Sequence, residues 1–445
     1  MTSCFRVIEH VIPCQHIREY PHATATEQEE VLNLAVKQYI PLDNPNPQPG
    51  DVTLIGAHAN GFPKELYEPL WEEIHARSKK AGFRIRGIWI ADVAHQGQSG
   101  VLNEYVLGND PSWYDHPRDL LNLVNMKRAE MPRPIVSWKY LTSPGKNFRV
   151  TLSILHPRLF TSLILLDPVI NRLEVLDDEY SKQAKVKIPV VTLVSTYRRD
   201  LWPSRVDAEK ALKRNKFYQN WDPRVLECFV KYGLRELPTA IYPLEGSSAN
   251  KSVGERPVTL TTTRHQEVFS FFRAAYGLNS NDCQSANRLT HPDLDSHIYK
   301  SAFPFYRYEV NKTFEMLPFV RPSVLYLFAE HSEVSNRKLN QEKVDQTGIA
   351  VGGSGGAAEG RVKGIVMEGV GHLIAMEAVN QTAELCANQI STEMQRWRKE
   401  EEQLAEEWKK RSPIEKMTVD QEWIRQVDLL RLRNVGKKPT TAAKL

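Results

Sequence analysis

The sequence predicts an α/β fold with a mostly parallel, doubly wound sheet and a helical cap inserted after the sixth strand. Between residues 51 and 170, short apolar runs typical of buried strands alternate with stretches of helical spacing. From residue 171 to 317 this alternation stops and the chain becomes helical, aromatic and charged, before strand character returns at residue 318. Such an alternation favours parallel strands covered by helices on both faces.

The expected elements follow in chain order. Residues 1–50 contain two strands, FRVIEHVI and LNLAVKQYIPL, and a Pro/Asn-rich turn. The first part of the core, residues 51–170, contains the strand DVTLIGAH, the helix ELYEPLWEEIHARSKKAG, the strand FRIRGIWIADV, the helix HPRDLLNLVNMKRAEM, the strand RPIVSWKYL, the helix NFRVTLSILHPRLF and the strand TSLILLDPVI. The cap, residues 171–317, is followed by the second part of the core, residues 318–395, and by a charged helical tail, residues 396–445.

Composition excludes several classes of function. The net charge of +4 is small and its basic residues are interleaved with acidic ones, which does not favour nucleic-acid binding. Five cysteines without a CxxC pair argue against a zinc site and a disulfide framework, so we expect no metal and no cofactor. Apolar runs such as LILL are far too short to cross a bilayer, so we expect no transmembrane segment.

Three loops follow predicted strands in the order that an α/β-hydrolase requires. A glycine-containing turn, Asn60, Gly61 and Phe62, lets backbone N–H groups approach a substrate oxygen, as an oxyanion hole needs. The second loop, residues 92–100, resembles the D-x-x-G-x-G-x-S loop that packs beside the active site in this fold. The third contains His372, which is the one histidine among 13 that lies in a G-x-G-H-L frame. His372 at the carboxyl edge of the sheet predicts a general base.

A general base of this kind requires a carboxylate partner, and the sequence offers three. Asp167 ends the sixth strand and is slightly favoured for that reason, although an N-cap would explain the same aspartate. Glu330 and Glu333 follow the seventh strand and are the alternatives.

The chain resembles a known family in five segments: AHANGFPKELYEPL, WIADVAHQGQSG, HPRLFTSLILLDPVI, WDPRVL and EGVGHLIAMEAV. It is similar to the α/β-hydrolases of fungal host-selective toxin clusters, of the AK-toxin and AF-toxin type, which are relatives of a yeast peroxisomal lipase. The resemblance implies a peroxisomal enzyme that helps to make or release an epoxy-decatrienoic acid. It also implies a nucleophile between the fifth strand and the helix after it.

That nucleophile position departs from the pattern of the family. Counting back from His156 places Ser143 there, with Gly145 preserved but Leu141 in place of the first glycine. Pro144 is the larger departure, because proline has no N–H to donate to an oxyanion and pushes the preceding residue toward extended dihedrals. The abrupt return of family-like sequence at Leu152 is also what an altered reading frame or a mis-spliced gene model produces.

The last three residues, Ala443, Lys444 and Leu445, form a close variant of the Ser-Lys-Leu peroxisomal address. We therefore expect a peroxisomal protein whose C-terminal tripeptide is recognised by the peroxisomal import receptor.

Three functions remain open from the sequence. The first is hydrolysis of an ester, thioester or epoxide of a medium-chain, lipid-like acid by a triad of Ser143, His372 and a carboxylate. The second is a binding or scaffold protein that keeps the fold and has lost turnover. The third is epoxide opening or a lyase reaction in which His372 acts without Ser143.

Overall fold

The structure of the chain is a computed structural model that describes residues 4–140, 148–172, 190–244, 252–276, 288–294, 305–332, 334 and 336–435. The chain divides into two compact units, Met1–Met394 and Gln395–Leu445. The first unit contains the sheet, the cap and the candidate site. In the second unit, the last helix is α16 (Gln421–Val435).

One sheet of eight strands forms the centre of the first unit, in the order β1-β2-β4-β3-β5-β6-β12-β13. The strands are β1 (Phe5–Pro13), β2 (Asn33–Pro41), β3 (Val52–Ala57), β4 (Ile85–Ala91), β5 (Ile135–Tyr140), β6 (Ser162–Leu166), β12 (Ser323–His331) and β13 (Val362–Gly371). The β1–β2 and β2–β4 pairs are antiparallel and the other pairs are parallel. The predicted α/β-hydrolase fold with a mostly parallel sheet is confirmed.

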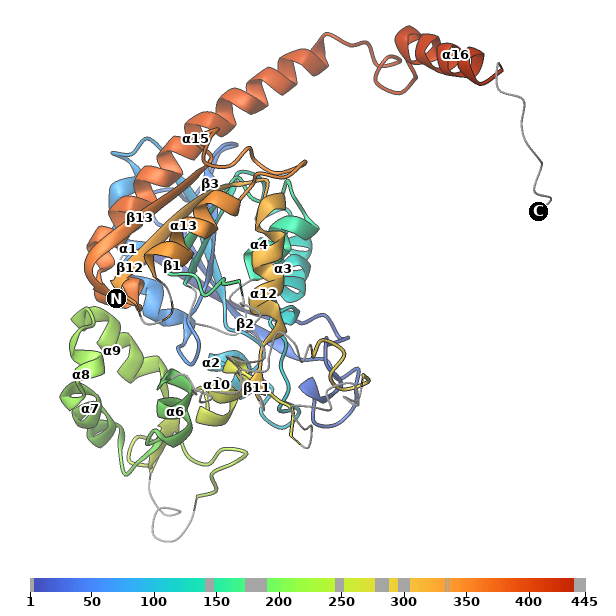
Figure 1. The fold of residues 1–445 in the computed structure, drawn as a ribbon. Helices are drawn as coiled ribbons and strands as arrows, with labels where there is room; N and C mark the ends of the chain where they lie inside the picture. Colours follow the sequence, from blue (N-terminus) through green and yellow to red (C-terminus); the bar gives the residue numbers. More distant parts are fainter. Residues whose placement is uncertain are drawn as a thin grey trace. The chain divides into compact units, whose positions relative to one another are not determined.

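Helices cover both faces of this sheet, as Figure 1 shows. One face packs against α1 (Glu68–Ser78), the short helix α14 (Ile374–Glu377) and the beginning of α15 (Val379–Lys409). The other face packs against α3 (Asp115–Met126), α4 (Phe148–Leu155) and the 3₁₀ helix η5 (Leu317–Phe319), with α13 (Arg337–Gln346) beside β13. Two buried apolar clusters, one on each face, therefore hold the sheet.

The cap lies between β6 and β12, where the sequence places it. Its helices are α6 (Val190–Tyr197), α7 (Arg205–Arg214), α8 (Lys216–Gln219), α9 (Pro223–Tyr232), α10 (Arg264–Phe271) and α12 (Tyr308–Met316), the last of which packs against α4 of the core. It also contains a three-stranded sheet of β7 (Leu201–Trp202), β9 (Val258–Leu260) and β8 (Leu234–Glu236), and the pair β10 (Arg273–Ala274) and β11 (Phe305–Tyr306). The sequence does not predict these sheets, because strands of two or three residues are too short to show a period of two.

Two cap residues attach the cap to the loops of the core. The Trp221 ring packs edge-on against Phe62, with ring centroids 5.2 Å apart, and the Asp222 N–H donates to the Met376 carbonyl at 2.7 Å. Phe62 follows β3 and Met376 follows β13, so one short cap segment contacts both ends of the candidate site.

The remaining described helices are η1 (Pro21–Ala23), η2 (Lys64–Tyr67) and α2 (Gly97–Leu102). In the part of the chain that the structure describes, every helix is too short or too polar to cross a membrane.

Candidate active site

His372 and Asp167 come together at the carboxyl edge of the sheet. Asp167 directly follows β6 and His372 directly follows β13, and these two strands are the neighbours of β12 on either side. The imidazole Nδ1 contacts a carboxylate oxygen of Asp167. The Asp167 side chain is fully buried, whereas 22% of the His372 side chain is exposed. Asp167 therefore contacts Nδ1 of the ring, an arrangement that sets the tautomer and the orientation of an imidazole.

The surroundings of Asp167 keep its carboxyl group ionised. Burial raises the pKa of Asp167, but the hydrogen bond and the charge of His372, the Ser332 hydroxyl and the Ala329 N–H together outweigh it. The Ala329 N–H lies 3.3 Å from the second carboxylate oxygen. The net pKa is below the ordinary value of an aspartate, so the carboxylate is charged at neutral pH and can stabilise an imidazolium.

Of the other two carboxylates considered from the sequence, Glu330 is exposed and accepts a hydrogen bond from the Gly369 N–H at 2.7 Å. Glu333 lies outside the described residues. Among the residues that the structure describes, Asp167 is thus the predicted acid that contacts His372.

Ser143, Leu141 and Pro144 also lie outside the described residues, as do Ala443, Lys444 and Leu445. The elements on either side of Ser143 are described: β5 ends at Tyr140 and α4 begins at Phe148. Because β5 lies between β3 and β6, the strand before Ser143 ends between the turn after β3 and Asp167.

The turn of Asn60, Gly61 and Phe62 is held by hydrogen bonds of its own. Gly61 has a φ of +78°, a conformation that favours glycine, and its N–H donates to the Gln96 side chain at 2.9 Å. The Phe62 N–H donates to the Ala59 carbonyl at 3.2 Å, and Gln96 donates to the Asn60 side chain at 2.6 Å. The Gly61 and Phe62 N–H groups thus already have acceptors, and a substrate oxygen that binds either of these two would have to replace its acceptor.

The cap helix α10 packs directly on this turn through Glu267. A Cβ atom at Gly61 would lie 2.8 Å from the Glu267 carboxyl carbon, so the missing side chain makes room for that carboxylate. The Asn60 side chain donates to the Glu267 carbonyl at 3.0 Å. Two side chains donate to this carboxylate. The Ser195 hydroxyl, on α6, donates at 2.7 Å, and the guanidinium of Arg198, the residue after α6, donates at 2.6 Å and neutralises the charge. Sequence reasoning missed Glu267 because no local pattern marks it.

The residues before the turn and in the loop after β4 have structural roles. His58 is fully buried, and burial lowers its pKa, so the ring is neutral. Its Nδ1 lies 2.8 Å from the Ala59 carbonyl, and its Nε2 accepts from the Val93 N–H at 2.9 Å. The buried Asp92 carboxylate accepts from the Lys64 ammonium at 2.7 Å. These bonds join the turn to the loop at residues 92–100.

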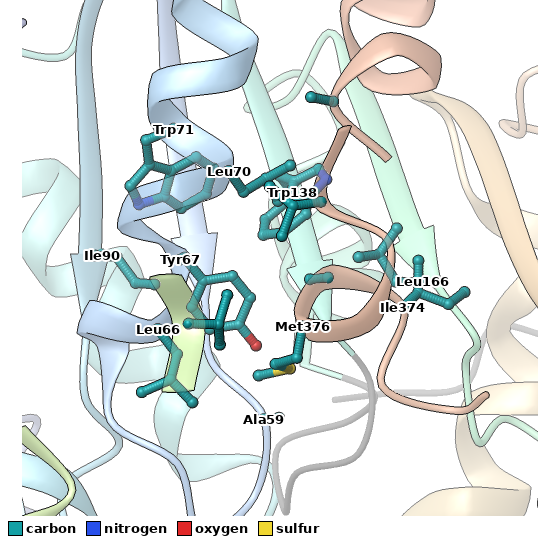
Figure 2. Close-up of a cluster of buried hydrophobic side chains, with 14 of the residues drawn as sticks. Ala59, Leu66, Tyr67, Leu70, Trp71, Ile90, Trp138, Leu166, Ile374 and Met376 are labelled. Carbon is teal, nitrogen blue, oxygen red and sulfur yellow. The ribbon is translucent and has the colours of Figure 1, made fainter. Parts of the chain in front are cut away.

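A buried apolar cluster lies beneath the turn and the histidine together. Figure 2 shows Ala59 and Tyr67 from the turn side beside Leu166, which precedes Asp167, and Ile374 and Met376, which follow His372. The helices η2 and α14 pack against each other. The turn and the His372–Asp167 pair therefore pack on one buried apolar cluster.

A separate cavity of about 700 Å³ lies between the cap and the core. The residues that line it include Thr24, His95 and Arg235, together with Gln266 and Phe269 of α10, and they do not include His372 or Asp167. The helix α10 therefore lines this cavity with one face, and its Glu267 packs against the turn of Asn60–Phe62.

No protein-family model matches the chain. A curated relative, the type I acyl-CoA thioesterase mpaH of Penicillium roqueforti, is 39% identical over 421 residues, which cover 92% of this chain and 93% of the relative. The chain belongs to this α/β-hydrolase family. The type I acyl-CoA thioesterase mpaH' of Penicillium brevicompactum is also 39% identical, over 95% of each chain.

The resemblance to toxin-cluster hydrolases is confirmed as well. The abhydrolase domain-containing protein AFT2-1 of Alternaria alternata is 26% identical over 260 residues, 58% of this chain and 84% of that protein. Among solved structures, the peroxisomal α/β-hydrolase Lpx1 of Saccharomyces cerevisiae matches with a TM-score of 0.63 and 15% identity, over 97% of this chain and 99% of Lpx1. At 15% identity, the likeness to Lpx1 shows a shared fold alone.

Proposed function

We propose that this α/β-hydrolase cleaves the acyl-CoA thioester of a medium-sized, lipid-like acid in fungal secondary metabolism. The contact of His372 with the buried, ionised Asp167, at the sheet edge that also carries the turn of Asn60–Phe62, is the observation that supports a hydrolytic triad. Among ester, thioester and epoxide, the family of the mpaH thioesterases favours the thioester.

In the proposed reaction, Ser143 Oγ attacks the thioester carbonyl carbon while His372 Nε2 takes the hydroxyl proton. The C–S bond then breaks, and the imidazolium returns the proton to the departing thiol. A water molecule, deprotonated by the same nitrogen, then attacks the acyl-serine carbonyl. The bond between the acyl carbon and Ser143 Oγ breaks, the imidazolium returns the proton to Oγ, and the carboxylic acid is released. Asp167 holds the ring through Nδ1, and a backbone N–H of the turn stabilises the oxyanion.

The test uses the full chain and a panel of acyl-CoA substrates of 6 to 16 carbons, including a polyunsaturated 10-carbon acid, which the toxin-cluster relatives suggest. Release of free CoA is followed with a thiol reagent. We expect turnover of at least one substrate, and its loss in Ser143→Ala and in His372→Ala. Activity that survives Ser143→Ala would instead support the reaction in which His372 acts without the serine.

A second candidate function is a binding or scaffold protein of the same pathway, and Pro144 is the observation that favours it. Without the N–H at residue 144, one of the two oxyanion donors of the fold is missing. This function predicts binding of an acyl-CoA with no burst of free CoA and no effect of His372→Ala on binding. Sequencing the transcript across codons 136 to 152 tests whether Pro144 is encoded at all.

The proposed location is the peroxisome, on the basis of Ala443, Lys444 and Leu445. An N-terminal fluorescent fusion of the full chain should enter peroxisomes of a fungal host and stay in the cytosol when these three residues are deleted. A cytosolic signal from both proteins would contradict the proposal.

A further inference from the structure

One carboxylate near His372 has no part in the triad. Glu377 is the last residue of α14, five positions after the histidine. One of its oxygens accepts from the Gly371 N–H at 2.8 Å, and the other accepts from the Leu373 N–H at 3.2 Å. These two residues flank His372, so a single side chain binds the backbone immediately before and immediately after the histidine.

The Glu377 carboxylate also explains why residue 371 is a glycine. The φ of Gly371 lies outside the left-handed region, so backbone conformation does not require glycine there. A Cβ atom at Gly371 would lie 2.7 Å from one Glu377 oxygen and 2.8 Å from the other. Space for the Glu377 carboxylate is therefore the physical reason for glycine at this position, and the two residues form one unit.

We propose that Glu377 is a positioning residue for His372. By holding both flanking N–H groups, its carboxylate sets the backbone at the histidine, so that the ring stays against Asp167 and Nε2 stays turned toward the nucleophile. A loop whose two amides are held by one carboxylate has little freedom to move, because hydrogen bonds to an ionised carboxylate are about twice as strong as neutral ones. The catalytic part of this inference rests on the proposed function.

The first test is Glu377→Gln in the full chain. A glutamine has one carbonyl oxygen, so it cannot accept from both N–H groups, and its NH₂ group would face the second one. We expect kcat on the best acyl-CoA substrate to fall about tenfold to hundredfold, because a displaced catalytic group costs that much, with KM changed less than twofold. The matched control is Glu368→Gln, which removes the same charge from an exposed position on β13.

A second readout needs no turnover. In protein labelled with ¹⁵N-histidine, the far-downfield proton on Nδ1 of His372 reports its hydrogen bond to Asp167. We expect this resonance to shift or disappear in Glu377→Gln and to remain in Glu368→Gln. If the wild-type chain cleaves none of the acyl-CoA panel, the proposed function fails, and this resonance still decides the role of Glu377.

A double-mutant cycle tests the unit formed with Gly371. Gly371→Ala alone places a methyl group against the Glu377 carboxylate and should lower kcat or the Nδ1 signal strongly. In a Glu377→Ala background the carboxylate is gone, so the same methyl group should have little further effect. Additive effects of the two changes, or an unchanged kcat and Nδ1 resonance in Glu377→Gln, would overturn the proposal.

Discussion

Asp167 has a backbone conformation that most residues avoid. Its φ is +40°, in the left-handed region that costs an ordinary L-residue about 1 to 2 kcal/mol and that aspartate tolerates better than most. The Asp167 N–H donates to the Leu327 carbonyl at 2.6 Å, and the side chain accepts from Ala329, so β12 holds both ends of the residue. Strain of this kind gathers at functional sites, where the surrounding structure imposes it.

Replacing Asp167 by Asn should lower kcat about a thousandfold to ten-thousandfold with little change in folding, because an amide cannot hold the same tautomer or stabilise an imidazolium. The measurement is thioester hydrolysis beside a circular dichroism spectrum. Glu330→Gln is the matched control, since Glu330 binds Gly369 and should leave most of the activity. A larger loss in Glu330→Gln than in Asp167→Asn would transfer the role to Glu330.

Residue 144 allows the opposite experiment, a gain of activity. Pro144→Ala restores a backbone N–H at the position after Ser143, and Pro144→Gly also restores conformational freedom. If the oxyanion lacks one donor in the native chain, kcat should rise by about a hundredfold to a thousandfold in one or both variants. Labelling of Ser143 by a fluorophosphonate should rise in parallel. Unchanged kcat in both variants would mean that the native turn needs no donor at this position.

At the scale of elements, the cap segment that begins at Trp221 connects the two halves of the site. Trp221 is 5% exposed and packs against Phe62 of the turn and Phe229 of α9, while the next residue binds Met376. WDPRVL is visible in the sequence as a segment that resembles the toxin-cluster hydrolases. Its contacts could not be predicted, because the turn and α9 are more than 150 positions apart in the chain.

Trp221→Ala should therefore lower both stability and turnover. Removal of a buried tryptophan costs about 3 to 5 kcal/mol of unfolding free energy, and it also removes the ring that holds Phe62. Urea unfolding followed by circular dichroism measures the first effect, and kcat in native buffer measures the second. Trp408→Ala serves as control, because Trp408 is 53% exposed. Equal losses in the two variants would contradict the packing role.

The helix α13 places a lysine in the core. Lys343 is fully buried, and burial lowers its pKa to about 8, although the charges of Asp167 and Glu342 oppose that shift. Below pH 8 the ammonium is charged in both the folded and the unfolded chain, and its burial then costs free energy. Between pH 8 and 10.5 the unfolded chain holds the proton and the folded chain does not, so this part of the stability rises with pH.

Lys343→Met should consequently raise the unfolding temperature at pH 7, by an amount that corresponds to at most about 3 kcal/mol, and the gain should shrink toward pH 10. Thermal unfolding at pH 6, 7, 8, 9 and 10 gives the profile. Lys338→Met, at an exposed position of the same helix, controls for the added methionine. A gain that does not change with pH would show that the folded and the unfolded chain hold this proton equally, so that burial does not lower the pKa of Lys343.

At the scale of the whole molecule, the large sheet and its inserted cap were predictable from the sequence. The hydrogen-bond network around the turn of Asn60–Phe62 was not. Strands such as β3 and β6 are continuous apolar runs, which buried parallel strands require. Asn60 and Glu267, in contrast, are hydrogen-bonded across 207 positions. Nothing local distinguishes Glu267 from another helical glutamate, because its role comes from the missing side chain of Gly61. Asp167 was predictable as one of three possible partners of His372, and the strand order and the side-chain contact single it out among the described residues.

The division of the chain into two units leads to the last prediction. The buried core includes Ile390 and Met394 of α15, and among the described residues none after Met394 belongs to it. A chain that ends at Met394 should therefore unfold within about 2 °C of the full chain, since surface positions contribute little to stability. A chain that ends at Leu385 loses Ile390, Met394 and Cys386, whose sulfur accepts from the Trp138 indole N–H at 2.9 Å.

The loss in the Leu385 variant follows from buried area. Burial of an isoleucine or a methionine side chain contributes about 1.5 to 3 kcal/mol each, so removing both should lower the unfolding temperature by several degrees or prevent folding. Differential scanning fluorimetry of the three proteins side by side makes the comparison. A drop in the Met394 variant as large as that in the Leu385 variant would mean that residues 395–445 stabilise the first unit. Hydrolysis by the Met394 variant at the rate of the full chain would place the whole of the catalytic apparatus within residues 1–394.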